Sequence, residues 1–272
     1  MRRKSLRLAA AVTPAALVMS LSMVMTGPVS IPTAAAQDAG PVEGSHSVVG
    51  PTTVVDHGVR VDGSCVNGSP VLSLAPGQYS VSASVKSADP STCEVTWQVD
   101  AVSTTRPKAP LRPADGTSLE ERAKVATPSP TRSDGVSVAA TYSGSGYERA
   151  WFEDVVGLEL NEVKSNLSFS YNRSCVTSAA GSGYWWWRSG TGWEPPTNKG
   201  AWISTTCNNS KVWSQADYRN TGFCAGYTSN THFRGVTVQG RYDGRLFGWV
   251  DSWSWNACLP FSFHSQLVRI TG

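Results

Sequence analysis

The chain has 272 residues, of which 40% are hydrophobic and 16% charged, with 23 basic and 20 acidic side chains. Four of the basic residues fall within positions 1–36, which hold no acid, so the remaining 236 residues carry 19 basic and 20 acidic side chains. This near-neutral balance argues against a nucleic-acid partner and against an anionic membrane surface. The length allows one large β domain or two small ones.

Residues 1–36 have the order of a secretory signal peptide. A basic head comes first, followed by a mostly apolar run from Leu8 to Met25 and the small residues Ala34-Ala35-Ala36. Signal peptidase recognises this order, and no basic stop-transfer cluster follows it. The alternative is a retained membrane helix, since the run is near the ~18 apolar residues that can span a bilayer. We expect residues 1–36 to be removed during export, by a route that the sequence leaves open. The mature protein is then expected to be a secreted or cell-wall-associated bacterial protein that makes no contact with the membrane.

Six cysteines in an exported chain favour disulfides over metal binding. They are Cys65, Cys93, Cys175, Cys207, Cys224 and Cys258, with no C-x-x-C pair among them. Cys65 and Cys93 are the two cysteines of the N-terminal part of the chain, and the next one is Cys175. We therefore expect Cys65 and Cys93 to pair with each other. The other four allow three pairings, of which Cys175–Cys207 with Cys224–Cys258 is our first choice. No metal site and no cofactor is predicted.

The N-terminal part of the mature chain, residues 37–102, is predicted to be a β domain. Thr52–Val61, Tyr79–Lys86 and Cys93–Val102 alternate apolar and polar residues and are separated by turn-forming segments, which is typical of strands.

Residues 103–135 break this pattern with five prolines and no aromatic residue. We interpret the segment as a proline-rich linker or a long loop. Ser118 and Glu121 have the spacing of a capping box, so a short helix over 118–126 is expected within it.

Residues 136–272 are predicted to form a Trp-rich β domain, with strands at Val136–Tyr142, Val155–Leu160, Leu167–Tyr171 and onward. The fold class is all-β, an antiparallel sandwich or barrel-like structure with disulfides. The parts before and after the linker are either two domains or one domain in which the first part supplies strands to the second.

Ten of the eleven tryptophans fall after the linker. Three are consecutive, Trp185-Trp186-Trp187, and cannot all face one core because side chains alternate along a strand. Some of them must be covered by another layer or be exposed, and exposed indoles are candidates for ligand stacking.

One hairpin is expected around Tyr242-Asp243-Gly244-Arg245, which fits a two-residue type I′ turn. In the register that this turn imposes, Val238 faces Trp249, Val236 faces Asp251, Arg234 faces Trp253 and His232 faces Trp255, all on one side. This mixture of rings and hydrogen-bonding groups suits a sugar, and it would equally suit a structural patch. The candidate ligand-binding residues are therefore Trp253, Trp255, Arg234, Asp251, His232, Trp185, Trp186 and Trp187.

No catalytic motif is present: the chain lacks G-x-S-x-G, H-E-x-x-H, a P-loop and a calcium loop. Carboxylates that could serve a glycosidase are numerous but follow no pattern. No catalytic residue is assigned, and an enzyme is the less favoured class.

The run Ala150-Trp-Phe-Glu-Asp-Val-Val-Gly-Leu158, with Leu167-Ser-Phe-Ser-Tyr-Asn172 and Ser174-Cys-Val176, resembles uncharacterised secreted actinobacterial proteins. The resemblance covers about residues 147–272 and implies export and a disulfide-bonded β fold. It transfers no catalytic or binding residue.

The favoured function is a non-catalytic extracellular binding module, with a glycan or a protein as partner. The alternatives are a protein-interaction, inhibitor or surface-structural protein, with loops such as Gly190–Lys199 as contacts, and a secreted hydrolase of unfamiliar type.

Overall fold

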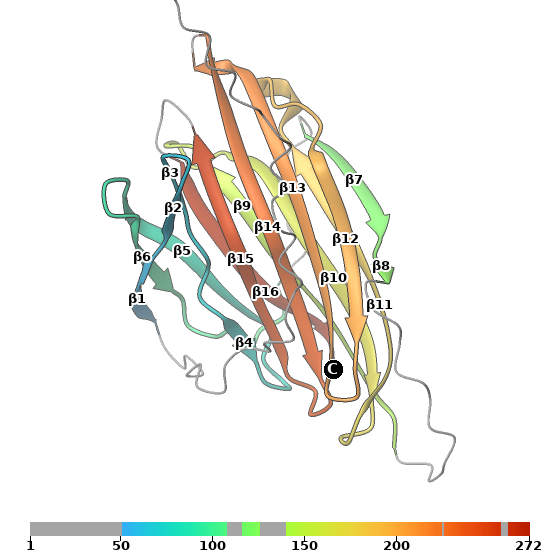
Figure 1. The fold of residues 1–272 in the computed structure, drawn as a ribbon. Helices are drawn as coiled ribbons and strands as arrows, with labels where there is room; N and C mark the ends of the chain where they lie inside the picture. Colours follow the sequence, from blue (N-terminus) through green and yellow to red (C-terminus); the bar gives the residue numbers. More distant parts are fainter. Residues whose placement is uncertain (1–50, 108–115, 126–139, 225, 257–260) are drawn as a thin grey trace, which may run out of the picture. The chain divides into compact units, whose positions relative to one another are not determined.

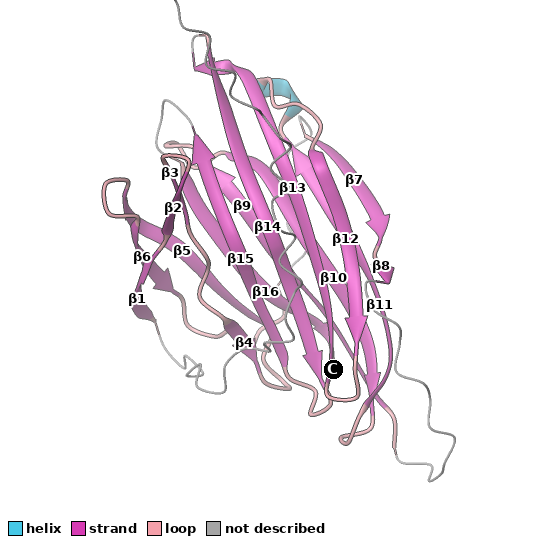
Figure 2. Cartoon of the chain, viewed as in Figure 1, coloured by secondary structure: helices cyan, strands magenta, loops and turns pink. Residues whose placement is uncertain are grey.

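The computed structural model describes residues 51–107, 116–125, 140–224, 226–256 and 261–272. The predicted signal peptide lies outside these residues. Two large sheets packed face to face account for most of the described chain (Figures 1 and 2). The prediction of an all-β, antiparallel sandwich with disulfides is therefore confirmed. Within the described ranges, no helix is long and apolar enough to cross a membrane.

The larger sheet has eight strands in the order β1-β6-β5-β16-β9-β10-β11-β7. Their bounds are β1 Thr52–His57, β5 Ser80–Asp89, β6 Glu94–Val99, β7 Thr117–Arg122, β9 Tyr142–Glu153, β10 Glu159–Tyr171, β11 Val176–Trp187 and β16 Ser262–Thr271.

The second sheet has six strands in the order β4-β15-β14-β13-β12-β8. Their bounds are β4 Leu72–Leu74, β8 Lys124–Val125, β12 Thr197–Thr205, β13 Asn209–Cys224, β14 Tyr227–Arg241 and β15 Leu246–Asn256. β8 is parallel to β12, and the other pairings are antiparallel. β2 (Val59–Val61) and β3 (Ser64–Val66) form a separate two-stranded ribbon, and Ser189–Thr191 is a single 3-10 turn.

Residues before the proline-rich segment contribute to both sheets. β5 pairs with β16, with Leu267 opposite Val81. β4 pairs with β15, with Leu246 opposite Leu74. The described part of 103–135 adds β7 and β8 to the free edges of β11 and β12 (Figure 1).

The helix predicted over 118–126 is wrong. Residues 117–122 form β7, which pairs with β11 so that Leu119 lies opposite Trp185. A capping box is a local preference of about 1 kcal/mol, and an isolated helix this short is unstable. The unpaired backbone along the edge of β11 offers a complete ladder of hydrogen bonds instead.

The other strand predictions have mixed outcomes. Strands occupy most of Thr52–Val61, Tyr79–Lys86 and Cys93–Val102, and Leu167–Tyr171 forms the end of β10. The strand predicted at Val155–Leu160 is wrong over most of its length, because Asp154 forms a turn there and accepts hydrogen bonds from the backbone of Val156 and Leu158. Most of the predicted strand Val136–Tyr142 lies outside the described residues.

Aromatic side chains fill much of the space between the sheets. Trp97, Phe152, Trp253 and Phe263 are almost fully buried and touch one another, with Trp253 stacked on Phe263 at 4.3 Å between ring centroids. Cys65 pairs with Cys93 and Cys175 with Cys207, as predicted. The predicted Cys224–Cys258 pair cannot be assessed because Cys258 lies outside the described residues.

Candidate functional site

The β14–β15 hairpin has a register one residue away from the predicted one. Val236 lies opposite Val250, and Thr237 lies opposite Trp249. The Arg241 amide donates to the Arg245 carbonyl, and Gly244 has a φ of 83°. The loop therefore contains three residues and ends with a left-handed glycine, a common hairpin form that Asp-Gly also accommodates.

This shift separates the side chains that we had expected on one face, because one residue of slip exchanges the two faces of a strand. Trp253 lies opposite Phe233 in the core and is 1% exposed. Arg234 and His232 lie opposite Ser252 and Ser254 on the outer face. Trp255 is stacked on Trp253 and is only partly buried.

The three consecutive tryptophans of β11 are all buried. Trp185, Trp186 and Trp187 are 0%, 2% and 7% exposed. Trp185 donates a hydrogen bond to the Gln215 carbonyl at 2.9 Å, and Trp186 packs so closely on Gly116 that a Cβ there would clash with its ring. None of these indoles is open to a ligand in this structure.

A different set of tryptophans forms a row on the outer face of the six-stranded sheet. Trp202 of β12 lies opposite Trp213 of β13, Trp213 lies opposite Thr237 of β14, and Thr237 lies opposite Trp249 of β15. Opposed residues share a face, and the neighbouring Val212, Val236 and Val250 point into the core. Trp202, Trp213 and Trp249 thus line up across β12, β13, β14 and β15, four strands that lie side by side in Figure 1.

The indoles of this row are held in place and partly exposed. The Trp202 and Trp213 rings are 6.3 Å apart and within 22° of parallel, and the Trp202 ring lies over Gly200. The Trp249 Nε1 donates to Asp251 at 2.7 Å. The ammonium of Lys211 lies 5.6 Å from the centre of the Trp213 ring.

Asp251 connects the row to the kink in β14. Gly235 has a φ of 60°, and a Cβ on it would overlap the Asp251 carboxylate. Burial raises the pKa of Asp251, while the Trp249 hydrogen bond and the charge of Lys211 oppose that rise. The side chain is exposed along much of its surface, but its carboxylate lies over Gly235.

A polar cluster centred on Asp217 lies farther along the same face. Asp217 Oδ1 is 2.8 Å from His232 Nδ1 and 2.6 Å from Arg234 Nη1, and Oδ2 accepts from Asn198. Burial alone would raise the pKa of Asp217, but the hydrogen bonds from His232, Arg234 and Asn198 outweigh it and hold the pKa well below its usual range. The carboxylate is therefore a permanent anchor for these three side chains.

The outer face of the eight-stranded sheet carries a separate ionic cluster. Arg149 contacts Glu159 at 2.8 Å and Glu162 at 2.9 Å, and its guanidinium lies 4.0 Å from the centre of the Trp151 ring. The hydrogen bond from His264 lowers the pKa of Glu153, with burial opposing and Trp151 assisting. A glycosidase acid needs a raised pKa, so this cluster fits ion pairing better than the hydrolase hypothesis.

Comparisons with protein-family models, with curated proteins and with solved structures give no match to this chain. Within the described ranges there is no group of three or more His, Cys, Asp or Glu side chains that could hold a metal ion.

Arg234, His232 and Asp251 thus lie beside the row, whereas Trp253 and Trp185–Trp187 are in the interior. Sequence analysis missed the role of Trp202, Trp213 and Trp249. Trp202 and Trp213 lie nearly symmetrically about the turn at 206–209, a signal that could have placed them opposite each other.

Proposed function

We propose that this chain is an exported binding module that takes a polysaccharide on the outer face of the six-stranded sheet. The observation that carries the proposal is the row of three partly exposed indoles, Trp202, Trp213 and Trp249, on adjacent strands of one face. Indoles offer a flat apolar surface of the kind that stacks on the apolar face of a sugar ring.

The spacing of the row suits a linear chain better than a single sugar. Trp213 and Trp249 are separated by β14, so their strands are two strand spacings apart, roughly 10 Å. That interval is comparable with the length of a disaccharide unit. A glycan running across the strands would therefore place alternate sugars over Trp213 and Trp249.

Hydrogen-bonding groups flank the row on both sides. Lys211 lies on one side of it, opposite the buried Gln239, and Asp251 lies on the other. Sugar hydroxyls need donors and acceptors of this kind, and Lys and Asp groups supply strong charge-assisted bonds. The combination supports a neutral or weakly charged polysaccharide as ligand.

Two observations support export. Residues 1–36 have the order of a signal peptide, and the Cys65–Cys93 and Cys175–Cys207 disulfides are typical of oxidising compartments. Detection of the chain, shortened by about its first 36 residues, in the culture medium or cell wall of its source would test this part.

The ligand proposal is tested by affinity electrophoresis of the oxidised chain through gels containing xylan, soluble β-glucan or glycol chitin, with tryptophan fluorescence as a second readout. We expect retardation by at least one polysaccharide. The double variant Trp213→Ala/Trp249→Ala should lose it while keeping the unfolding midpoint of a folded protein.

Tyr227→Ala is the matched control, because Tyr227 is 75% exposed and lies outside the row. It should leave retardation unchanged. Retardation that survives in the double variant, or that Tyr227→Ala abolishes equally, would contradict the proposal, as would the absence of binding to every glycan tested.

A further inference from the structure

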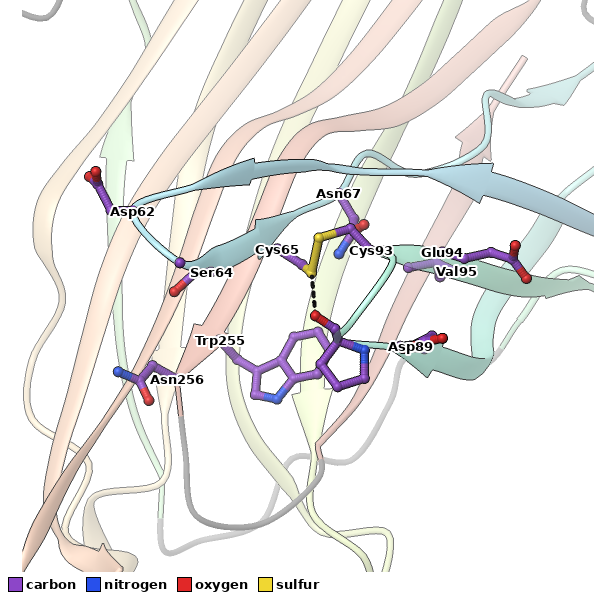
Figure 3. A pocket seen from close by; sticks show the side chains of 13 residues that line it. Asp62, Ser64, Cys65, Asn67, Asp89, Cys93, Glu94, Val95, Trp255 and Asn256 are labelled. Atoms are coloured by element: carbon purple, nitrogen blue, oxygen red, sulfur yellow. Dashed lines mark hydrogen bonds between the residues drawn. A yellow bond between two sulfur atoms is a disulfide. The ribbon is translucent and has the colours of Figure 1, made fainter.

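A pocket of about 390 Å³ lies between the β2–β3 ribbon, the turn from β5 to β6, and the end of β15 (Figure 3). It is separate from the tryptophan row, because Trp255, which lines it, is stacked on the core residue Trp253, whereas Trp249 lies on the outer face of the sheet and does not line the pocket. The pocket is lined by Cys65 and Cys93, Trp255, Asn67 and the acids described below.

The walls of this pocket are fixed by covalent and polar links. The Cys65–Cys93 disulfide joins β3 to the β5–β6 turn. Arg60 donates hydrogen bonds to the carbonyl oxygens of Gly63, Pro90 and Ser91, and so joins the same two segments a second time. The pocket is therefore preorganised, which lowers the entropic cost of binding.

Trp255 supplies a rigid aromatic surface. Its ring is stacked on that of Trp253 at 5.3 Å and within 14° of parallel. Trp253 is 1% exposed and part of the core. The indole of Trp255 is thus held by the core while its residue borders the pocket, and Figure 3 shows it below the disulfide.

The charge of the lining has one sign. Among the described residues that line the pocket, Asp62, Asp89 and Glu94 are acidic and none is basic. Asp62 and Glu94 lie on opposite sides of the pocket, and their carboxylates point away from it (Figure 3), so these two acids can attract a cation only through their electrostatic field. Arg60 directs its N–H groups to backbone carbonyls, and the three carboxylates still outnumber it. A cleft lined by one sign of charge concentrates ions of the other sign.

The side chain of Asn67 is a buried polar group in the wall of the pocket. Asn67 lines the pocket and is 2% exposed, yet neither its amide oxygen nor its amide nitrogen has a hydrogen-bond partner among the described residues. Its backbone is fixed by two hydrogen bonds to Trp253. A buried amide without partners is costly, and a ligand that bears both a donor and an acceptor would satisfy it.

We propose that this pocket binds a small ligand that carries an ammonium group beside hydroxyl groups, with an amino sugar as the best-fitting class. The ammonium stacks on or near the Trp255 ring as a cation–π contact and is attracted by Asp62, Asp89 and Glu94. The Asn67 amide bonds to the hydroxyl or ammonium groups. The site is independent of the polysaccharide row, and each stands without the other.

The test is titration calorimetry, or ligand-observed NMR, of the oxidised full chain with glucosamine and with glucose. These two probes have the same ring and differ at carbon 2, where one has an ammonium and the other a hydroxyl. We expect glucosamine to bind at least about tenfold more tightly than glucose, and its affinity to fall as salt is raised.

The double variant Asp89→Asn/Glu94→Gln keeps the size of both side chains and should weaken glucosamine binding about fivefold or more. Glu194→Gln removes one exposed carboxylate elsewhere and should change nothing. Trp213→Ala/Trp249→Ala should leave glucosamine binding intact, which separates this site from the row.

Equal affinity for glucose and glucosamine would overturn the charge assignment. Binding of neither probe would overturn the site, and so would a double variant that binds glucosamine as the natural chain does. Trp255→Phe gives an independent check: its smaller ring should weaken glucosamine binding while the unfolding midpoint shows that the fold is kept.

Discussion

Ser265 of β16 donates a 2.6 Å hydrogen bond to Glu148 of β9 in the space between the two sheets. Glu148 is fully buried, and its second carboxyl oxygen lies so close to Gly248 that a Cβ there would overlap it. Burial raises the pKa of Glu148 to about 8, against the opposing effects of the Ser265 hydrogen bond and the charge of Arg149. The group is therefore protonated in the folded protein at pH 7.

This carboxyl makes stability depend on pH. In the unfolded chain Glu148 loses its proton near pH 4.5, and in the folded protein near pH 8. Between these values the folded state holds one proton more, so the free energy of unfolding falls as pH rises. The Glu148→Gln variant keeps an acceptor for Ser265 and has no charge to bury. We expect it to match the natural chain near pH 4 and to exceed it by a few kcal/mol at pH 8.

Urea unfolding at pH 4, 6 and 8 measures this difference. Glu120→Gln is the control, because Glu120 is exposed at the edge strand β7 and should not alter the pH dependence. If Glu148→Gln had the same slope between pH 4 and 8 as the natural chain, Glu148 would not be protonated in the fold.

Asp217 should have the opposite pH dependence. Its folded pKa is lowered, so its contribution to stability is present above the unfolded pKa near 4 and is lost as pH falls below that value. Asp217→Asn should lower the free energy of unfolding at pH 7 by about 2 kcal/mol, since it weakens charge-assisted bonds to His232 and Arg234. The loss should shrink at pH 3. A deficit that is as large at pH 3 as at pH 7 would show that these bonds do not depend on the carboxylate charge.

Arg269 connects three segments that are distant in sequence. Its Nη2 donates to the carbonyls of Leu74 and Gly244, at 3.0 and 2.9 Å, and its Nε donates to Gln78. Arg269 is 1% exposed. Arg269→Lys keeps the charge but cannot reach three carbonyls at once, so we expect a loss of about 3 kcal/mol in urea unfolding. Arg245→Lys, at a side chain 57% exposed, should cost less than about 0.5 kcal/mol, and an equal cost for both variants would contradict the assigned role.

These contacts also show what the sequence could and could not predict. The alternation of apolar and polar residues was sufficient to predict the all-β class and the approximate positions of β1, β5 and β6. The Cys65–Cys93 pair followed from its isolation in the sequence. The pairing of β5 with β16 could not be predicted from either segment alone, because the packing of side chains from many strands in the core determines which strands pair.

The sequence did not predict the candidate site because it left the loop length, and hence the register, of one hairpin open. An Asp-Gly pair fits both two-residue and three-residue hairpin loops, and the choice between them moves every side chain of β15 to the other face. The predicted register put Trp253 beside Arg234, whereas in the structure Trp253 lies opposite Phe233 in the core. The slip alone would leave Trp249 on the same face as Trp253. Trp249 is in the outer row because β14 and β15 also exchange their buried and exposed faces at Gly235 and Asp251, where their pairing is interrupted. Arg234, His232 and Asp251 came close to the right place because this exchange of faces at Gly235 leaves all three on the outer face.

Gly235 offers a direct test of how the kink in β14 shapes the tryptophan row. An alanine there must adopt a φ of 60°, and its Cβ would overlap the Asp251 carboxylate. The backbone conformation alone costs about 1–2 kcal/mol, and displacement of Asp251 also breaks its 2.7 Å hydrogen bond with Trp249. Gly235→Ala should therefore lower stability and weaken polysaccharide retardation together.

A double-mutant cycle separates these two effects. In an Asp251→Ala background the overlap is gone, and Gly235→Ala should cost only the backbone strain. We expect the two substitutions to be less than additive in urea unfolding, with a coupling of about 1 kcal/mol. Strict additivity would mean that Asp251 does not lie over Gly235, and that Trp249 is oriented by its strand alone.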